Sequence, residues 1–77
     1  MPEQLATAAI VIIGNEILSG KVKDENSHSL CRELRDLGVE VRSIVTIPDD
    51  TETISNVVWQ ASEKYTWVFT SGGIGPT

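Results

Sequence analysis

The feature that most limits the possible folds is the apolar run Ala8–Ile13 (AAIVII), which is closed by Gly14. The run does not alternate with polar residues and is rich in β-branched side chains. Both properties are typical of a strand that is buried on both faces of a parallel sheet. We therefore expect residues 8–13 to form the first strand of an α/β fold.

The segment that begins at Ser27 has the spacing of an amphipathic helix. Its apolar residues recur at i, i+1, i+4 and i+7, namely at Leu30, Cys31, Leu34 and Leu37. Gly38 is suited to the left-handed conformation that ends many helices. Cys31 lies on the apolar stripe, which favours a core position over a role as a nucleophile.

A second strand, a second helix and a third strand follow. Val39–Ile47 is rich in β-branched residues and ends at Pro48, which cannot donate to the hydrogen-bond ladder of a sheet. Asp50 or Thr51 is suited to cap the next helix, whose apolar face is formed by Ile54, Val57, Val58 and Ala61. The short third strand, Trp67–Thr70, leads into the glycine-rich segment Ser71–Thr77.

This alternation of strands and helices predicts an α/β fold of three layers, with a parallel sheet and helices on both of its faces. If the first strand lies between the other two, right-handed crossovers place one helix on each face. Each face then keeps uncovered apolar surface, and Pro76 suits the first position of a further helix. We therefore expect residues 1–77 to be the incomplete N-terminal half of a larger domain.

The loops after the first and third strands are expected to diverge and to open a ligand crevice. The loop after the third strand contains Gly72, Gly73 and Gly75, whose backbone can approach a phosphate or carboxylate closely. Ser71 and Thr77 add hydroxyl donors. We favour an anion-binding loop over a plain strand-to-helix turn, because three glycines in four residues exceed what a turn requires.

The loop Gly14–Asn26 is polar and long for a connection between a strand and a helix. It is not a P-loop, because its glycines are separated by five residues rather than four and Val22 stands where a Ser or Thr would hold magnesium. Glu16 and Asp24 are candidates for binding a metal or substrate hydroxyls. Asp24 and Asn26 are equally suited to cap the helix that follows.

Two carboxylates, Asp49 and Asp50, follow the second strand at the same edge of the predicted sheet. Paired carboxylates in this position are suited to hold a divalent cation that bridges substrate phosphates. Alternatively, Asp50 caps the second helix. For Asp49, which lies just before that cap, we favour a functional role.

The charge balance excludes some kinds of partner. Six basic and eleven acidic residues give a net charge of −5, which argues against a nucleic-acid surface. No apolar run approaches the ~18 residues needed to span a membrane, and the N-terminus has no secretory signal. The single cysteine agrees with a reducing compartment. We expect a cytoplasmic protein that binds neither nucleic acid nor membrane.

Several strings of the sequence together resemble the molybdopterin-binding-like domain shared by molybdenum-cofactor proteins, CinA proteins and FAD synthases. They are GNEILSG, DEN, LCRELRDLGVEV, IPDD and VFTSGGIGPT, and the resemblance covers residues 8–77. Within that family, the helix LCRELR and the ending GGIGPT are most similar to the N-terminal domain of eukaryotic FAD synthases. CinA-type proteins are the nearest alternative.

The resemblance implies a nucleotide or pterin ligand, a divalent metal such as Mg or Co, and self-association. It assigns Asp49 to the acidic position of a Pro-Asp corner, which makes Asp49 the expected catalytic residue. The paired carboxylates make Asp49 and Asp50 the expected metal ligands. Asn15 stands where Asp is common in the family. The ligand-binding positions implied by the resemblance are Gly14, Glu16, Gly72, Gly73, Gly75, Pro76 and Thr77, and the hydroxyl of Ser71 is a further candidate from the loop itself.

Three functions follow from the resemblance. In the first, the intact domain hydrolyses FAD or, as in CinA-type proteins, ADP-ribose by metal-activated water. In the second, it is a regulatory module that binds a nucleotide or pterin without catalysis. In the third, residues 1–77 are a fragment without activity of their own. The adenylyl transfer of FAD synthases (FMN adenylyltransferase activity) belongs to a separate C-terminal unit.

Overall fold

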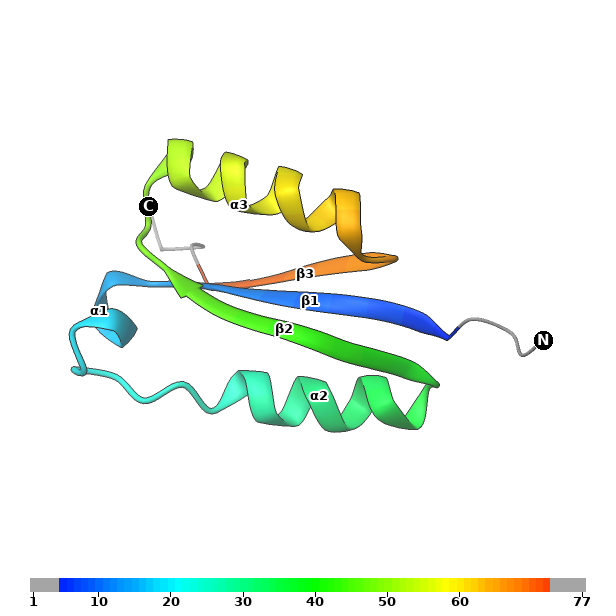
Figure 1. Cartoon of the computed structure of the whole chain (residues 1–77). Helices are drawn as coiled ribbons and strands as arrows, with labels where there is room; N and C mark the ends of the chain where they lie inside the picture. Colours follow the sequence, from blue (N-terminus) through cyan, green and yellow to red (C-terminus); the bar gives the residue numbers. More distant parts are fainter. Residues whose placement is uncertain (1–4, 73–77) are drawn as a thin grey trace.

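Strands and helices alternate along the chain in the computed structural model, which describes residues 5–72. The elements are β1 (Ala6–Ile13), α1 (Asn15–Leu18), α2 (Asn26–Asp36), β2 (Val39–Ile47), α3 (Thr51–Lys64) and β3 (Trp67–Gly72). The strands form a parallel sheet in the order β2-β1-β3. Helix α2 covers one face of the sheet and α3 the other (Figure 1). The predicted α/β fold with three layers is confirmed, and the structure shows the first strand between the other two.

Strand β1 forms the centre of the protein because it is apolar on both of its faces. All residues from Ala8 to Ile13 are at most 5% exposed. On one face Ala8, Ile10 and Ile12 pack with Leu34 of α2. On the other face Val11 and Ile13 pack with Ile47 of β2 and with Ile54 and Val57 of α3. The continuous apolar run therefore serves two cores, one on each side of the sheet.

Strand β2 contains a bulge that explains its mixed sequence pattern. Ala8 pairs with Val41 and Ala9 with Ser43, so Arg42 is an extra residue on β2. Before the bulge, Val39 and Val41 pack on the α2 side, whereas Ile47 after it packs on the α3 side. The change from alternating to continuous apolar residues marks this switch of faces. Bulges also protect edge strands, and β2 is an edge of the sheet.

The helices begin and end close to their predicted positions. Asp50 caps α3, and Gly38, with a φ of 85°, follows α2 as the sequence predicts. The loop Gly14–Asn26 is not entirely irregular, however, because α1 forms one turn there and packs Ile17 against the α2-side core. No helix within residues 5–72 is long and apolar enough to cross a membrane.

Two strands are longer than predicted. Strand β1 begins at Ala6 rather than at Ala8. Strand β3 ends at Gly72 rather than at Thr70, because Ser71 and Gly72 pair with Ile12 and Ile13 of β1. The prediction that Ser71 and Gly72 belong to the glycine loop is therefore wrong, because these two residues are the last residues of β3 that pair with β1.

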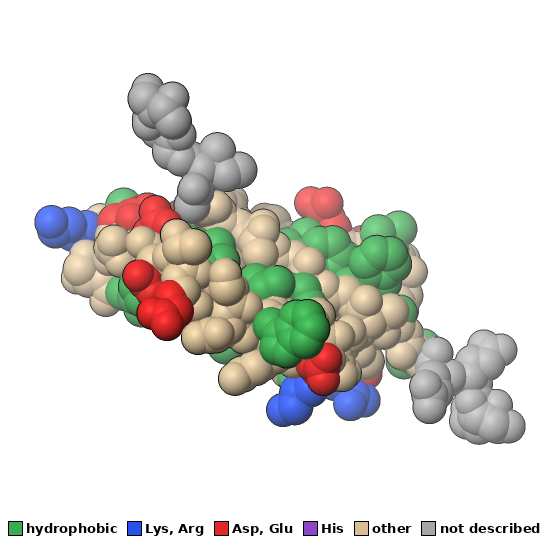
Figure 2. All heavy atoms as spheres, turned by 90° about the horizontal axis from the view of Figure 1, so that it is seen from above, with side chains coloured by type: hydrophobic (Ala, Val, Ile, Leu, Met, Phe, Trp, Pro, Cys, Tyr) green, Lys and Arg blue, Asp and Glu red, His purple; other side chains and the backbone are tan. Residues whose placement is uncertain are grey.

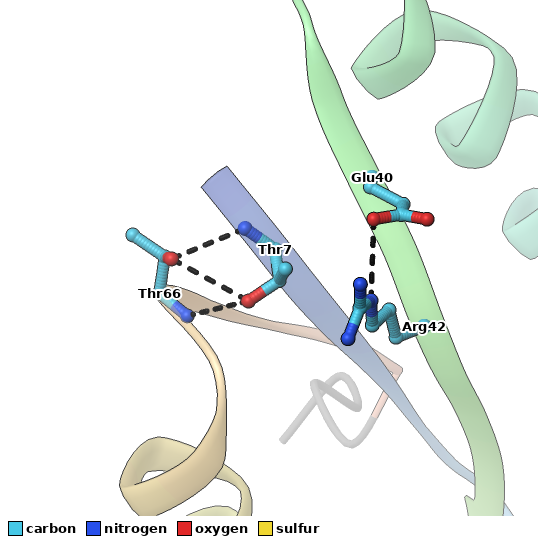
Figure 3. A network of polar contacts seen from close by, with 4 residues as sticks. All are labelled: Thr7, Glu40, Arg42 and Thr66. Carbon is cyan, nitrogen blue, oxygen red and sulfur yellow. Dashed lines mark hydrogen bonds and ion pairs between the residues drawn. The ribbon is translucent and has the colours of Figure 1, made fainter. Parts of the chain in front are cut away.

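At the amino end of the sheet, polar side chains bind one another (Figure 3). The backbone N–H of Thr7 donates to Oγ1 of Thr66 over 3.1 Å, and the N–H of Thr66 donates to Oγ1 of Thr7 over 3.2 Å. On β2, the Nε of Arg42 donates to a carboxylate oxygen of Glu40 over 3.2 Å. The threonine pair ties the start of β1 to the residue that precedes β3.

Candidate functional site

The three strands end level with one another at the carboxyl end of the sheet. Ile13 of β1 pairs with Ile47 of β2 and with Gly72 of β3. In open parallel sheets, ligands bind at this end. Six of the predicted site residues lie here or immediately beyond it: Gly14, Glu16, Asp49, Asp50, Ser71 and Gly72. Four others, Gly73, Gly75, Pro76 and Thr77, lie outside the described residues.

Gly72 is required by the packing of the two strands as well as by its backbone conformation. Its φ is 89°, in the left-handed region that favours glycine. A Cβ atom at this position would lie 2.2 Å from the carbonyl oxygen of Ile13. Any other residue would push β3 away from β1. A glycine permits this positive φ, whereas the close approach to Ile13 becomes visible only in the folded chain.

Gly14 connects the end of β1 to the end of β2. Its N–H donates to the carbonyl of Ile47 over 3.0 Å, which adds one hydrogen bond after the last residue of β1. A Cβ atom on Gly14 would lie 3.1 Å from a carboxylate oxygen of Glu16. The small residue at position 14 therefore leaves room for the Glu16 carboxylate to fold back over the end of β1.

Asn15 links the first loop to the corner after β2. Its side-chain oxygen Oδ1 accepts a hydrogen bond of 3.1 Å from the backbone N–H of Asp49, a residue 34 positions later. Asp49 itself is exposed, and its carboxylate forms no hydrogen bond or ion pair with residues 5–72. The backbone of Asp49 is thus held while its carboxylate stays free. This contact was not predicted from the sequence, in which an Asn directly after Gly14 is its only signal.

Asp50 has the capping role that the sequence analysis left open. Its Oδ2 accepts hydrogen bonds from Oγ1 of Thr53 over 2.7 Å and from the N–H of Thr53 over 2.9 Å. The hydroxyl contact, followed by the backbone contact, lowers the pKa of Asp50 below its ordinary value. A metal role for Asp50 stays a prediction, and it would compete with this cap.

Asp24 similarly prepares the start of α2. Its carboxylate accepts hydrogen bonds from the Ser27 hydroxyl and from the N–H groups of Asn26 and Ser27. The Ser27 hydroxyl is the main cause of a pKa of Asp24 below the ordinary value. Neither predicted residue occupies the N-cap position, which is Glu25 and forms no side-chain cap hydrogen bond. Asp24 accepts the first N–H groups of the helix from the residue before it, and Asn26 is the first residue of the helix.

The described residues do not form a metal site by themselves. Within residues 5–72, no group of three or more His, Cys, Asp or Glu side chains lies close enough to hold a metal ion. Asp50 is engaged in its cap, which leaves Asp49 as one free carboxylate at the corner. Magnesium usually keeps several waters and is bound by one or two carboxylates together with substrate phosphates. Among the described residues Asp49 offers such a carboxylate, and the predicted Mg or Co stays a prediction.

Grooves on the described surface lie away from these residues. One of about 670 Å³ lies beside α2 and β2 and is lined in part by Cys31, Val41 and Ile44. Another of about 620 Å³ lies beside α3 and β2. Seen from the α3 side, acidic side chains are scattered over the surface, including the carboxyl end of the sheet, and hydrophobic side chains are exposed along the middle of the molecule (Figure 2). The candidate site is therefore defined by strand ends and loops rather than by an apolar groove.

A family model described as "Probable molybdopterin binding domain" matches residues 9–77. The chain belongs to this family. A "Probable FAD synthase" of Caenorhabditis elegans is 53% identical over 77 residues, which are all of this chain and 15% of that protein. A "CinA-like protein" of Thermotoga maritima is 40% identical over 70 residues, which are 91% of this chain and 17% of that protein. The resemblance predicted from the sequence is confirmed.

A solved structure shares this arrangement of strands and helices. It is the crystal structure of the protein CinA, of unknown function, from Thermoplasma acidophilum. The TM-score is 0.88 at 33% sequence identity, and the match covers 95% of this chain and 43% of the CinA chain. The molybdopterin-binding-like chain described here thus spans less than half of the length of each of these relatives.

Proposed function

We propose that this domain binds a nucleotide or a pterin at the carboxyl end of its sheet. The observation that carries the proposal is the pairing of Ile13 with Ile47 and with Gly72, which ends the three strands level with one another. The loop after β1, the corner after β2 and the glycine segment after β3 all start from this end of the sheet. An anionic group of the ligand would be held by backbone amides of the segment that begins at Gly72. Local amides suit this task in a chain of net charge −5.

Asp49 would supply the complementary contact. Its exposed carboxylate is free of hydrogen bonds and ion pairs within residues 5–72, and it is an acceptor for ribose hydroxyls or for the amine groups of a purine or pterin. A phosphate held by amides and a hydroxyl or amine held by Asp49 would together select a nucleotide-like ligand over a simple anion.

Calorimetric titration of the full-length protein with FAD and with ADP-ribose tests this proposal. We expect saturable binding that weakens by about tenfold in Asp49→Ala, since one hydrogen bond to a charged group is lost. Glu52→Ala is a suitable control, because Glu52 is an exposed carboxylate in the first turn of α3. Absence of binding by the unaltered protein would refute the proposal.

Hydrolysis of the bound nucleotide is a second candidate function, favoured by the free carboxylate of Asp49. It is tested by following cleavage of FAD and ADP-ribose with and without Mg²⁺ or Co²⁺. If Asp49 is catalytic, Asp49→Asn abolishes cleavage. If cleavage is absent from the unaltered protein while binding persists, the domain is a regulatory module of an attached FAD synthase-like or CinA-like protein. A cytoplasmic location and self-association remain proposals of the same kind.

A further inference from the structure

The corner between β2 and α3 is unusually well determined by hydrogen bonds. The N–H of Gly14 donates to Ile47, and the N–H of Asp50 donates to the carbonyl of Pro48 over 2.9 Å. Pro48 has no N–H of its own, so Asp49 offers the first backbone donor after β2. Oδ1 of Asn15 accepts this hydrogen bond. The Asn15 side chain therefore continues the contact between β1 and β2 past the point where both strands end.

We propose that Asn15 is a positioning residue for ligand binding, acting through Asp49. This inference rests on the proposed function. By holding the backbone N–H of Asp49, Asn15 fixes the place on the corner from which the Asp49 side chain starts. Asp50 holds the other side of the corner through its cap on Thr53. The backbone of Asp49 is thus held from both sides before any ligand arrives, which lowers the backbone entropy lost on binding.

The amide chemistry of Asn15 also matters at this position. An Asp side chain would accept the same N–H of Asp49, yet it would add a negative charge next to Asp49 and to an anionic ligand. Asn15 supplies the acceptor without the charge. In a protein without excess positive charge, this choice favours binding of a phosphate at the same edge.

Two variants of the full-length protein separate these roles: Asn15→Ala and Asn15→Asp. The control is Thr7→Val, which removes a hydrogen bond between distant segments of the same chain at the other end of the sheet. Hydrogen exchange at the Asp49 amide reports the contact itself. We expect Asn15→Ala to speed this exchange and to weaken FAD binding about tenfold, corresponding to one hydrogen bond. Thr7→Val is expected to leave both readouts unchanged.

Asn15→Asp is expected to keep the slow exchange and to bind FAD more weakly at low salt. Its affinity relative to the unaltered protein should recover at about 0.5 M salt, where charge repulsion is screened, whereas that of Asn15→Ala should not. In an Asp49→Ala background, Asn15→Ala should have no further effect on binding, because the residue acts through Asp49.

The outcomes distinguish the inference from the proposed function. If the unaltered protein binds neither FAD nor ADP-ribose, both are refuted. If it binds FAD and Asn15→Ala binds equally well, the positioning role is refuted and the proposed function stands. The positioning role is also refuted, and the proposed function still stands, if Asn15→Ala weakens binding equally in the presence and absence of the Asp49 carboxylate. That result would indicate that Asn15 acts directly on the ligand or only on the structure.

Discussion

The two ends of the sheet use polar side chains in different ways. At the amino end, Thr7 and Thr66 satisfy each other's backbone and hydroxyl groups (Figure 3). At the carboxyl end, Asn15 holds the backbone of Asp49 and leaves its carboxylate without a hydrogen bond or ion pair to residues 5–72. Both ends join segments far apart in the sequence. At the carboxyl end, a fixed backbone is combined with a carboxylate that has no partner within residues 5–72.

This difference indicates which substitutions should affect stability and which should affect binding. At the amino end, the hydrogen-bonding groups of Thr7 and Thr66 bind each other, so their loss should lower the stability of the fold without changing ligand affinity. At the carboxyl end, Gly72 is needed for the fold, whereas Asp49 contributes little to it. The carboxyl end itself therefore contains residues that are needed for the fold and residues that are available for ligand binding.

The largest effect on stability is expected for Gly72→Ala. The new Cβ would meet the carbonyl of Ile13 and the residue would keep a φ of 89°, so we expect a loss of roughly 3 kcal/mol in the free energy of unfolding. Gly38→Ala is the matched control, because its φ is 85° and nothing lies within 4 Å of the added atom. It should lose about 1 kcal/mol. Equal losses in denaturant titrations would contradict the close approach of β1 and β3.

At the amino end, we expect Thr66→Val to lower the free energy of unfolding by about 1 kcal/mol. The substitution keeps the shape of the side chain and removes the oxygen that accepts the N–H of Thr7. Denaturant titration measures the loss, and calorimetry with FAD should give unchanged affinity. Weakened FAD binding in this variant would break the distinction between the two ends.

The smallest effect concerns the cap of α3 and depends on pH. The pKa of Asp50 is lower in the folded protein than its ordinary value, so the carboxylate stabilises the fold above the unfolded pKa of about 3.9. This contribution is lost as the pH falls through the folded pKa. Asp50→Ala should therefore melt below the unaltered protein at neutral pH, and the difference should shrink below about pH 4.

Asp50→Asn is the control for that titration. An Asn side chain caps a helix nearly as well as Asp and does not ionise in this range. Its melting temperature should stay above that of Asp50→Ala at neutral pH and in acid alike. A gap between Asp50→Ala and the unaltered protein that is constant down to about pH 2 would contradict the capping account.

The fold was predictable from the sequence because its signals are local. The run Ala8–Ile13 marks the central strand, and Gly38 marks the end of α2. The four-residue helix α1 was missed because one turn is too short to show a period. The bulge at Arg42 was missed because it exists only relative to the pairing of β2 with β1.

The candidate site was predictable in its place but not in its details. The parallel direction of the strands brings Gly14, Asp49 and Gly72 to one end of the sheet, and this direction follows from the sequence of strands and helices. The contact of Asn15 with Asp49 joins residues 34 positions apart through a side chain, which no spacing rule describes. Asp50 was open to two interpretations because a cap and a metal ligand need the same carboxylate.

The central claim is that a nucleotide-like ligand binds where the three strands end. It is tested most directly by mapping amide chemical shifts of the full-length protein during titration with FAD. We predict that the shifts concentrate at residues 14–16, 47–50 and 71–72, with Thr7 and Thr66 unaffected. Shifts concentrated at the amino end, or along the groove lined by Cys31, Val41 and Ile44, would contradict the account.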